Sequence, residues 1–195
     1  MTRRSAGAND RELQLERPGR RAYVVLFLLA VALPTLLGTL LPWLDEGVRS
    51  GVSVGALVLG LSLVVYLALV LVMRRHRLQI DAGGIEVATT FYTRHLRWEQ
   101  LRLDAARVID IQERTELRPA VKSNGVSMPG FHSGRFRARN LGRLFVATAG
   151  GRRLLWLPTH EGYDLLLQPR KPAAALERMK ALAATQAMAP GSRGR

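Results

Sequence analysis

The sequence predicts a two-helix transmembrane hairpin followed by a mainly β domain that ends in one α-helix. Two runs, residues 22–44 and 52–73, contain no Asp, Glu, Lys, Arg or His. Beyond residue 76 apolar and polar residues alternate, which is the period of half-buried strands. The expected organisation is a basic N-terminal segment (residues 1–21), the hairpin (22–73), a β domain (74–188) and a disordered tail (189–195).

Each apolar run is long enough to cross a bilayer as a helix. A helix rises about 1.5 Å per residue, so about 20 residues span a hydrocarbon core of about 30 Å. The very short joint at residues 45–51 favours a hairpin. A cleaved signal peptide is the alternative for the first run, but that run is longer than a usual signal core and a second span follows seven residues later.

Basic residues at the ends of the two runs predict the orientation of the hairpin. Arg20 and Arg21 precede the first run, Arg74 and Arg75 follow the second, and the joint has one Arg. By the positive-inside rule, both termini are expected in the cytoplasm. Arg outnumbers Lys 26 to 3, which is typical of a bacterial genome rich in G and C. The expected location is therefore the bacterial cytoplasmic (inner) membrane, with a multi-pass topology.

Small residues recur four apart at the start of the second run, as Gly51 and Gly55 and then Ala56 and Gly60. Small residues at this spacing allow two helices to approach closely. Packing against the first helix of the same hairpin is the favoured interpretation, and a dimer interface is the alternative. Neither run holds an Asp, Glu, Lys, Arg or His, which argues against a transporter or a channel.

The β domain is expected to hold about seven strands and one C-terminal helix. Apolar residues alternate from Leu78 to Val87 around a Gly83-Gly84 turn, as in a β-hairpin. Pro172 suits the first position of a helix that continues to residue 187. The remaining strands are expected at residues 91–98, 108–111, 135–138, 144–148, 153–157 and 163–167.

Four segments carry a resemblance to a known family: residues 80–85 (IDAGGI), 103–108 (LDAARV), 123–130 (SNGVSMPG) and 157–167 (LPTHEGYDLLL). In these segments and in the order of its elements, the chain resembles the bacterial pleckstrin-homology-like (bacterial PH domain) membrane proteins over roughly residues 22–183. The resemblance implies a bent seven-stranded sandwich or barrel that is plugged by the C-terminal helix, and a location at the membrane. It implies no activity, because lipid head-group binding is common but far from universal in the wider fold family.

An acid-free basic window is the strongest charge feature of the domain. Between Glu116 and Glu161 there are eight basic residues and no carboxylate. Alternate residues of a strand share one face, so Arg135, Arg137 and Arg139 are expected to project together. The candidate contacts for lipid or a partner are Arg135, Arg137, Arg139, Arg152 and Arg153.

Three interpretations of these arginines stay open: bidentate binding of phosphate, delocalised attraction to anionic lipid, and a solvated outer face of the sheet. Nucleic acid is not an expected partner, because aromatic residues make up only 6% of the chain and no recognition helix is visible.

A loop expected from Ser123 to Gly134 is the other candidate contact. It is rich in Gly, has no acid and holds Met128 and Phe131, which are expected to be exposed. Its apolar tip could enter lipid or clasp a partner. Alternatively, the segment could be an ordinary turn region folded over the sheet.

No enzyme, cofactor or metal site is expected. The chain has no Cys, its four His lack metal-ligand spacing, and no Gly-x-Ser-x-Gly elbow, phosphate loop or dinucleotide fingerprint is present. A hydrolase that uses His132 or His160 with a loop serine is the least favoured alternative. The expected function is a membrane-anchored, cytoplasm-facing binding module for anionic lipid head groups or a membrane partner. The alternative is a protein-interaction or self-assembly subunit, including a homo-oligomer.

Overall fold

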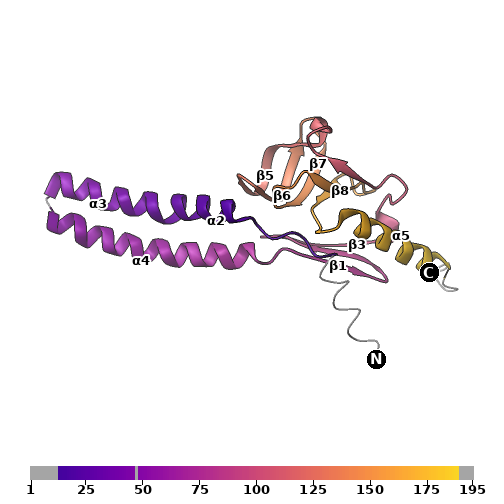
Figure 1. Cartoon of the computed structure of the whole chain (residues 1–195), viewed down its shortest axis with the longest axis horizontal. Helices are drawn as coiled ribbons and strands as arrows, with labels where there is room; N and C mark the ends of the chain where they lie inside the picture. Colours follow the sequence, from indigo (N-terminus) through magenta and orange to yellow (C-terminus); the bar gives the residue numbers. More distant parts are fainter. Residues whose placement is uncertain (1–12, 47, 189–195) are drawn as a thin grey trace, which may run out of the picture. The chain divides into compact units, whose positions relative to one another are not determined.

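The computed structural model describes residues 13–46 and 48–188, which fall into two compact units. One unit is Pro18–Arg74, and the other combines residues 13–17 with residues 75–188. Figure 1 colours the chain from indigo to yellow along the sequence. The expected disordered tail, residues 189–195, lies outside the described residues.

The first unit is an antiparallel pair of helices (Figure 1). Its elements are α2 (Arg20–Phe27), a π-helical turn η1 (Leu28–Ala32), α3 (Leu33–Glu46) and α4 (Val48–Met73). Two segments, Arg20–Leu44 and Ser50–Met73, are long and apolar enough to cross a membrane. The π turn comes just before Pro34, whose missing N–H leaves the carbonyl group of Ala30 without its usual helical partner.

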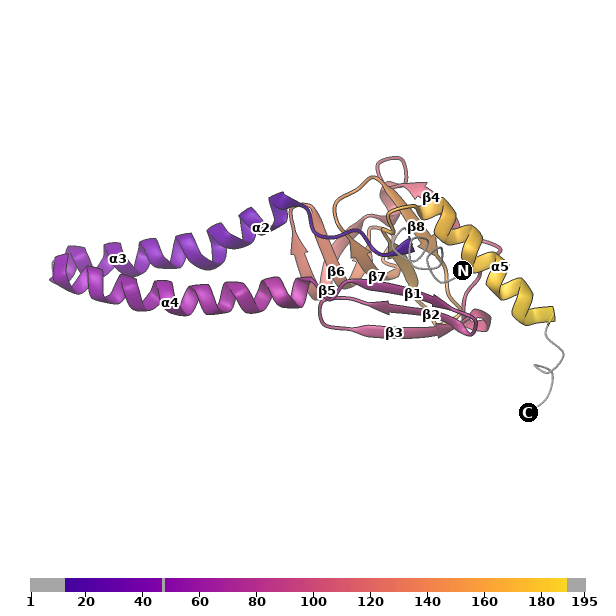
Figure 2. The ribbon, with the colours of Figure 1, turned by 60° about the horizontal axis from the view of Figure 1, so that its bottom comes forward.

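The second unit begins with a sheet of three antiparallel strands in the order β1-β2-β3. They are β1 (Arg77–Asp81), β2 (Gly84–Ala88) and β3 (Thr93–Arg97), and Figure 2 shows them side by side as one layer. The register pairs Leu78 with Val87 and Ile85 with Leu96, and all four side chains are buried. The expected β-hairpin of β1 and β2 is therefore present.

The second sheet has six strands in the order β4-β8-β9-β7-β6-β5. Neighbouring strands are antiparallel except β7 and β9, which are parallel. The strands are β4 (Arg107–Asp110), β5 (Pro119–Met128), β6 (Phe131–Ala138), β7 (Arg143–Thr148), β8 (Arg153–Leu157) and β9 (Asp164–Leu167).

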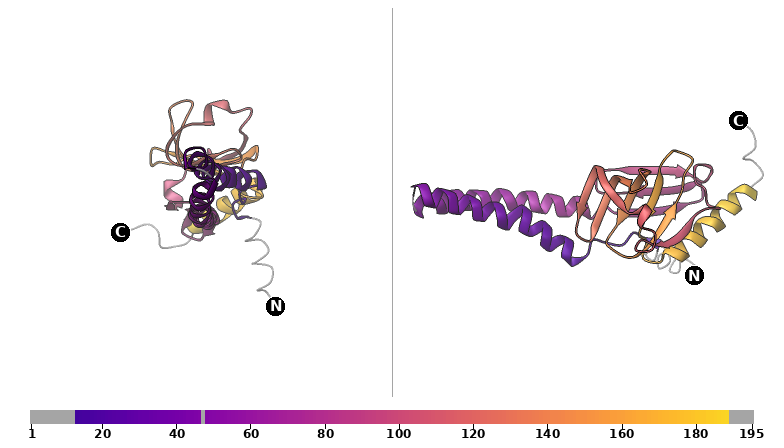
Figure 3. Two further views of the ribbon diagram at one scale, coloured as in Figure 1. Left: turned by 90° about the vertical axis from the view of Figure 1, so that its left-hand side faces the viewer. Right: turned by 90° about the horizontal axis from the view of Figure 1, so that it is seen from above.

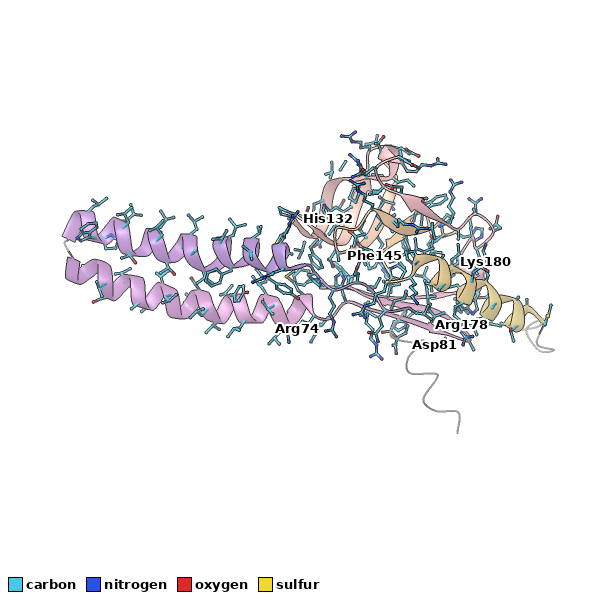
Figure 4. The ribbon with its side chains drawn as sticks, in the orientation of Figure 1. Arg74, Asp81, His132, Phe145, Arg178 and Lys180 are labelled. Carbon is cyan, nitrogen blue, oxygen red and sulfur yellow. The ribbon has the colours of Figure 1, made fainter. Side chains whose placement is uncertain are left out.

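The main core lies on the face of the six-stranded sheet that carries Phe145, which Figure 4 shows inside the domain. Side chains of the three-stranded sheet belong to the same cluster, and α5 (Pro172–Met188) adds Leu176 and Met179 to it. Figure 3 shows α5 running along one side of the domain. Leu144 and Val146 of β7 belong to a second cluster, because alternate residues of a strand face opposite sides of the sheet.

Residues 13–17 complete this domain. Leu15 forms an isolated antiparallel bridge with Pro169 and is only 2% exposed within the main core. The N–H group of Glu16 donates to the carbonyl oxygen of Gln168 at 2.8 Å, and the Gln168 side-chain amide donates to the Glu16 carboxylate. Sequence reasoning treats this stretch only as part of a basic tail, so its place in the core is a finding of the structure.

The expected fold class is confirmed, but the strand count and one loop differ from expectation. The described residues hold nine strands where about seven are expected. The expected loop at residues 123–134 is the β5–β6 hairpin, which turns at residues 129–130. Gly125 and Gly134 pair across it, and a Cβ on Gly134 would lie 2.6 Å from the carbonyl oxygen of Asn124. Glycine thus allows two strands to approach closely here, rather than forming a loop.

Candidate functional site

A basic pocket lies between β3 of the first sheet and β6 and β7 of the second. Its volume is about 270 Å³, and four arginines, Arg94, Arg135, Arg137 and Arg143, contribute to its walls. Phe145 and other apolar residues form the rest of the lining, together with Ser123 and Tyr163. All of these residues belong to the β domain.

The strand register explains how these arginines come together. Arg135 pairs with Phe145 across β6 and β7, and Arg137 pairs with Arg143. Directly paired residues of antiparallel strands share one face, so these three arginines continue the face that carries Phe145. Arg94 comes from β3 in the other sheet. The inner faces of the sandwich are therefore apolar at the centre and basic at this end.

Two tyrosines contact two of the guanidinium groups. The Cζ atom of Arg135 lies 5.1 Å from the centre of the Tyr92 ring, and that of Arg94 lies 5.8 Å from the centre of the Tyr163 ring. A guanidinium above an aromatic face is held electrostatically, and its N–H donors stay around its rim. The pocket therefore presents partly oriented hydrogen-bond donors.

The positive charge of the pocket is not balanced by acids in its walls. Within the described residues, the ion pairs are Glu86 with His95 at 3.5 Å and Arg114 with Glu116 at 3.2 Å. Neither pair involves an arginine of the pocket, and no carboxylate of the described residues lines it. An anionic ligand would therefore meet guanidinium groups that have no carboxylate partner.

The pocket wall includes the phenol of Tyr163, whose pKa is raised. Burial raises the pKa of Tyr163, and the charge of Glu161 raises it further, while Arg94 and Arg135 lower it. The Glu161 carboxylate accepts a hydrogen bond from Nε2 of Gln100 at 2.9 Å. The phenol of Tyr163 is therefore protonated at neutral pH and can donate a hydrogen bond.

The five arginines singled out in the sequence are divided among separate surfaces. Arg135 and Arg137 line the pocket. Arg139 is expected on the same strand face, but β6 ends at Ala138, so Arg139 lies in the following turn and is exposed. Arg153 begins β8 and Arg152 precedes it. In the sheet, β9 and β7 separate β8 from β6, and the two arginines line other cavities.

Sequence reasoning missed Arg94 and Arg143 as members of one site. Arg143 has a local signal, because only residues 139–142 separate it from β6 and a tight connection places it opposite Arg137. Arg94 has no such signal, since its position depends on how the two sheets pack.

The two apolar residues proposed for lipid contact are less accessible than expected. Phe131 is fully buried, and its ring centre lies 4.8 Å from that of His76. Met128 is half-buried and pairs with Phe131 at the end of the hairpin. The expectation that Phe131 is exposed was wrong, because the tip of the hairpin is the two-residue turn Pro129-Gly130.

A buried hydroxyl cluster joins β6 to the start of the domain. Ser133 Oγ accepts hydrogen bonds from Oγ1 of Thr90 at 2.8 Å and from the Thr90 N–H group, and it lies 2.9 Å from Nε2 of His76. His76 Nε2 also lies 3.4 Å from Oγ1 of Thr90, so one ring nitrogen of His76 faces both hydroxyl groups. Nδ1 has no hydrogen-bond partner in the part of the chain that the structure describes. Burial lowers the pKa of His76 to about 4.

This cluster does not match the hydrolase alternative. A nucleophile must reach its substrate, but Ser133 is 0% exposed. Its partner is His76, whereas the alternative requires His132 or His160. His132 instead packs against Phe136, with ring centres 5.9 Å apart, and burial lowers its pKa. Among the described residues, no group of three or more potential ligands is placed to hold a metal ion.

In the helical unit, Gly51 and Gly55 of α4 lie against α3. A Cβ on Gly51 would lie 2.7 Å from the carbonyl oxygen of Thr39, and a Cβ on Gly55 would meet the Thr39 side chain. Ala56 and Gly60 are exposed, and no described atom lies within 4 Å of a Cβ added to Gly60. The first two residues therefore favour packing within the hairpin, while the last two leave a small-residue face uncovered.

The model of one family, described as bacterial PH domain, matches residues 77–182, which is more than half of the chain. The match extends from the first residue of β1 into α5. Neither the curated proteins nor the solved structures gave a match.

Proposed function

Because this chain belongs to the bacterial PH domain family, we propose that it is a membrane-anchored, non-catalytic binding module that faces the cytoplasm and contacts anionic lipid head groups. One observation carries the proposal: α4 ends at Met73 and the first strand begins at Arg77. An extended chain covers at most about 3.6 Å per residue, so the intervening link is short. A bilayer crossed by α4 would hold the domain at its surface.

The charge of the chain supports both the orientation and the lipid contact. Residues 74–195 contain 22 basic and 10 acidic residues, a net charge of +12. An anionic leaflet attracts basic residues near its surface by about 1 kcal/mol each. The tether already holds the domain at the membrane, so this attraction determines the orientation of the domain at the surface.

The orientation is tested with reporters fused after Arg195. A reporter that is active only in the cytoplasm should give a signal, and a phosphatase that is active only outside the cytoplasm should be silent. Phosphatase activity from this fusion would contradict the proposed topology.

The lipid contact is tested with the full chain in nanodiscs of neutral lipid, with or without phosphatidylglycerol. The chain has no Cys, so Val121→Cys, at a side chain that is 58% exposed, provides a single site for a fluorophore. A quencher on the lipid head groups should then reduce the fluorescence only when anionic lipid is present. The effect should weaken between 0.1 M and 1 M salt, as the Debye length falls from about 10 Å to about 3 Å. Equal quenching with and without anionic lipid would refute the proposed contact with anionic head groups.

A protein-interaction or self-assembly subunit is the second candidate, and β5 favours it. This ten-residue strand is an edge of the six-stranded sheet and is mostly exposed. An edge strand offers unpaired N–H and C=O groups to a strand of another chain. Crosslinking in native membranes separates the candidates: a discrete oligomer that survives replacement of Arg135, Arg137 and Arg139 by Ala would favour assembly.

A further inference from the structure

We propose that the pocket formed by Arg94, Arg135, Arg137 and Arg143 is a specific binding site for a phosphate monoester. The inference deepens the proposed function, because it names a ligand class for the domain, and it rests on that function for its position at a membrane. The phosphate can belong to a lipid head group or to a soluble ester, since both present the same group to the arginines.

The pairing of Arg137 with Arg143 is the first reason. These residues lie directly opposite each other on β6 and β7, and like charges in such pairs destabilise a sheet. Arg135 follows on the same face of β6, and Arg94 approaches from the other sheet. No carboxylate of the described residues lines the pocket to offset this repulsion. An anion bound between the arginines would offset it.

The number of donors is the second reason. A phosphate monoester has three terminal oxygens and a charge of about −1.5 to −2 at pH 7, and each guanidinium can bind two oxygens in parallel. A diester has only two terminal oxygens and a single charge. Arginines that converge from three strands of two sheets match the monoester better.

The remaining walls suit an ester rather than a free inorganic ion. Beside the arginines, the pocket of about 270 Å³ has an apolar wall that includes Phe145, whose side chain lies on the same face of the sheet as the arginines. The protonated phenol of Tyr163 adds one neutral donor. The organic part of a small ester can therefore contact apolar side chains while its phosphate contacts the guanidinium groups.

The test uses the full chain in nanodiscs, with one soluble arm and one lipid arm. In the soluble arm, calorimetry compares glycerol 3-phosphate with the diester glycerophosphoglycerol on nanodiscs of neutral lipid. In the lipid arm, phosphatidate is compared with phosphatidylglycerol at equal surface charge, and amide hydrogen exchange of β6 and β7 reports occupancy. The variant is Arg143→Gln, and the matched control is Arg139→Gln, which removes the same charge from the exposed turn beside the pocket.

We expect the monoester to be preferred in at least one arm, and the arm that shows the preference identifies the source of the phosphate. Arg143→Gln should weaken binding about tenfold or more, because hydrogen bonds to charged groups are strong, and Arg139→Gln should change it less than about twofold. Arg143→Gln also relieves the repulsion at Arg137, so it should fold at least as stably as the parent, which thermal unfolding checks.

Equal binding of monoester and diester in both arms would overturn the proposal, and so would equal losses from the two substitutions. Either result would indicate delocalised electrostatic attraction rather than a specific phosphate site. The quenching of the Val121→Cys label by anionic nanodiscs would persist in that case, so the proposed function would stand without the specific site.

Discussion

Lowering the pH from 7 to 4 is expected to destabilise the β domain through His76. Its imidazole is buried against Phe131, and its Nε2 lies 2.9 Å from the Ser133 hydroxyl oxygen. Protonation would place a second N–H on the ring, and Ser133 already accepts two hydrogen bonds from Thr90. The folded domain therefore resists protonation of His76, and the unfolded chain does not.

The size of the effect follows from the two pKa values. The pKa of His76 is 6.5 in the unfolded chain and about 4 in the folded domain. Between these values the unfolded state binds more protons, so the stability is fully present above pH 6.5 and is lost as the pH falls toward 4. One pKa unit corresponds to about 1.4 kcal/mol, which gives a loss of about 3 kcal/mol. His132, whose pKa is also lowered, contributes in the same direction.

Two measurements on the full chain in nanodiscs check this prediction. NMR of histidines labelled at Cε1 should show that the His76 side chain is still unprotonated at pH 5. Urea unfolding at several pH values, followed by tryptophan fluorescence, should give a free energy that falls with pH. His76→Gln keeps an acceptor for Ser133 but does not titrate, so it should flatten most of this slope, whereas the exposed His160→Gln should leave it unchanged. A His76 resonance that titrates near pH 6.5 in the folded chain would refute the reasoning.

Three further substitutions test packing. Gly51→Ala presses a methyl group against a backbone carbonyl of α3 and should cost about 1–3 kcal/mol in thermal unfolding, whereas Gly60→Ala should be neutral. Phe131→Ala should cost about 3–5 kcal/mol in urea unfolding of the β domain, and the half-buried Met128→Ala much less. Leu15→Ala should cost about 2–5 kcal/mol in the same assay, and an unchanged stability would show that residues 13–17 are not part of the domain.

Periodicity predicts the strands that have one buried face, and it fails at the edge. The hairpin of β1 and β2 was predicted because Leu78 and Val87 mark a buried face on either side of a glycine turn. In contrast, β5 is an edge strand that is exposed on most of its length, so residues 119–128 show no apolar alternation. Gly125 and Gly134 predict a loop from the sequence, whereas in the structure they pair across two closely spaced strands. Leu15 was missed for another reason, because its partner Pro169 is distant in the sequence.

Only part of the candidate pocket could be predicted from the sequence. Alternation along β6 places Arg135 and Arg137 on one face, but the choice of Arg143 and Arg94 as their neighbours requires strand register and sheet packing. The register also separates two explanations of the basic face. A face that only needs solvation gains nothing from opposing Arg137 with Arg143, since an acid at either position would remove the repulsion. An anion bound between these two exposed arginines would remove their repulsion, so the pair supports the proposed ligand site.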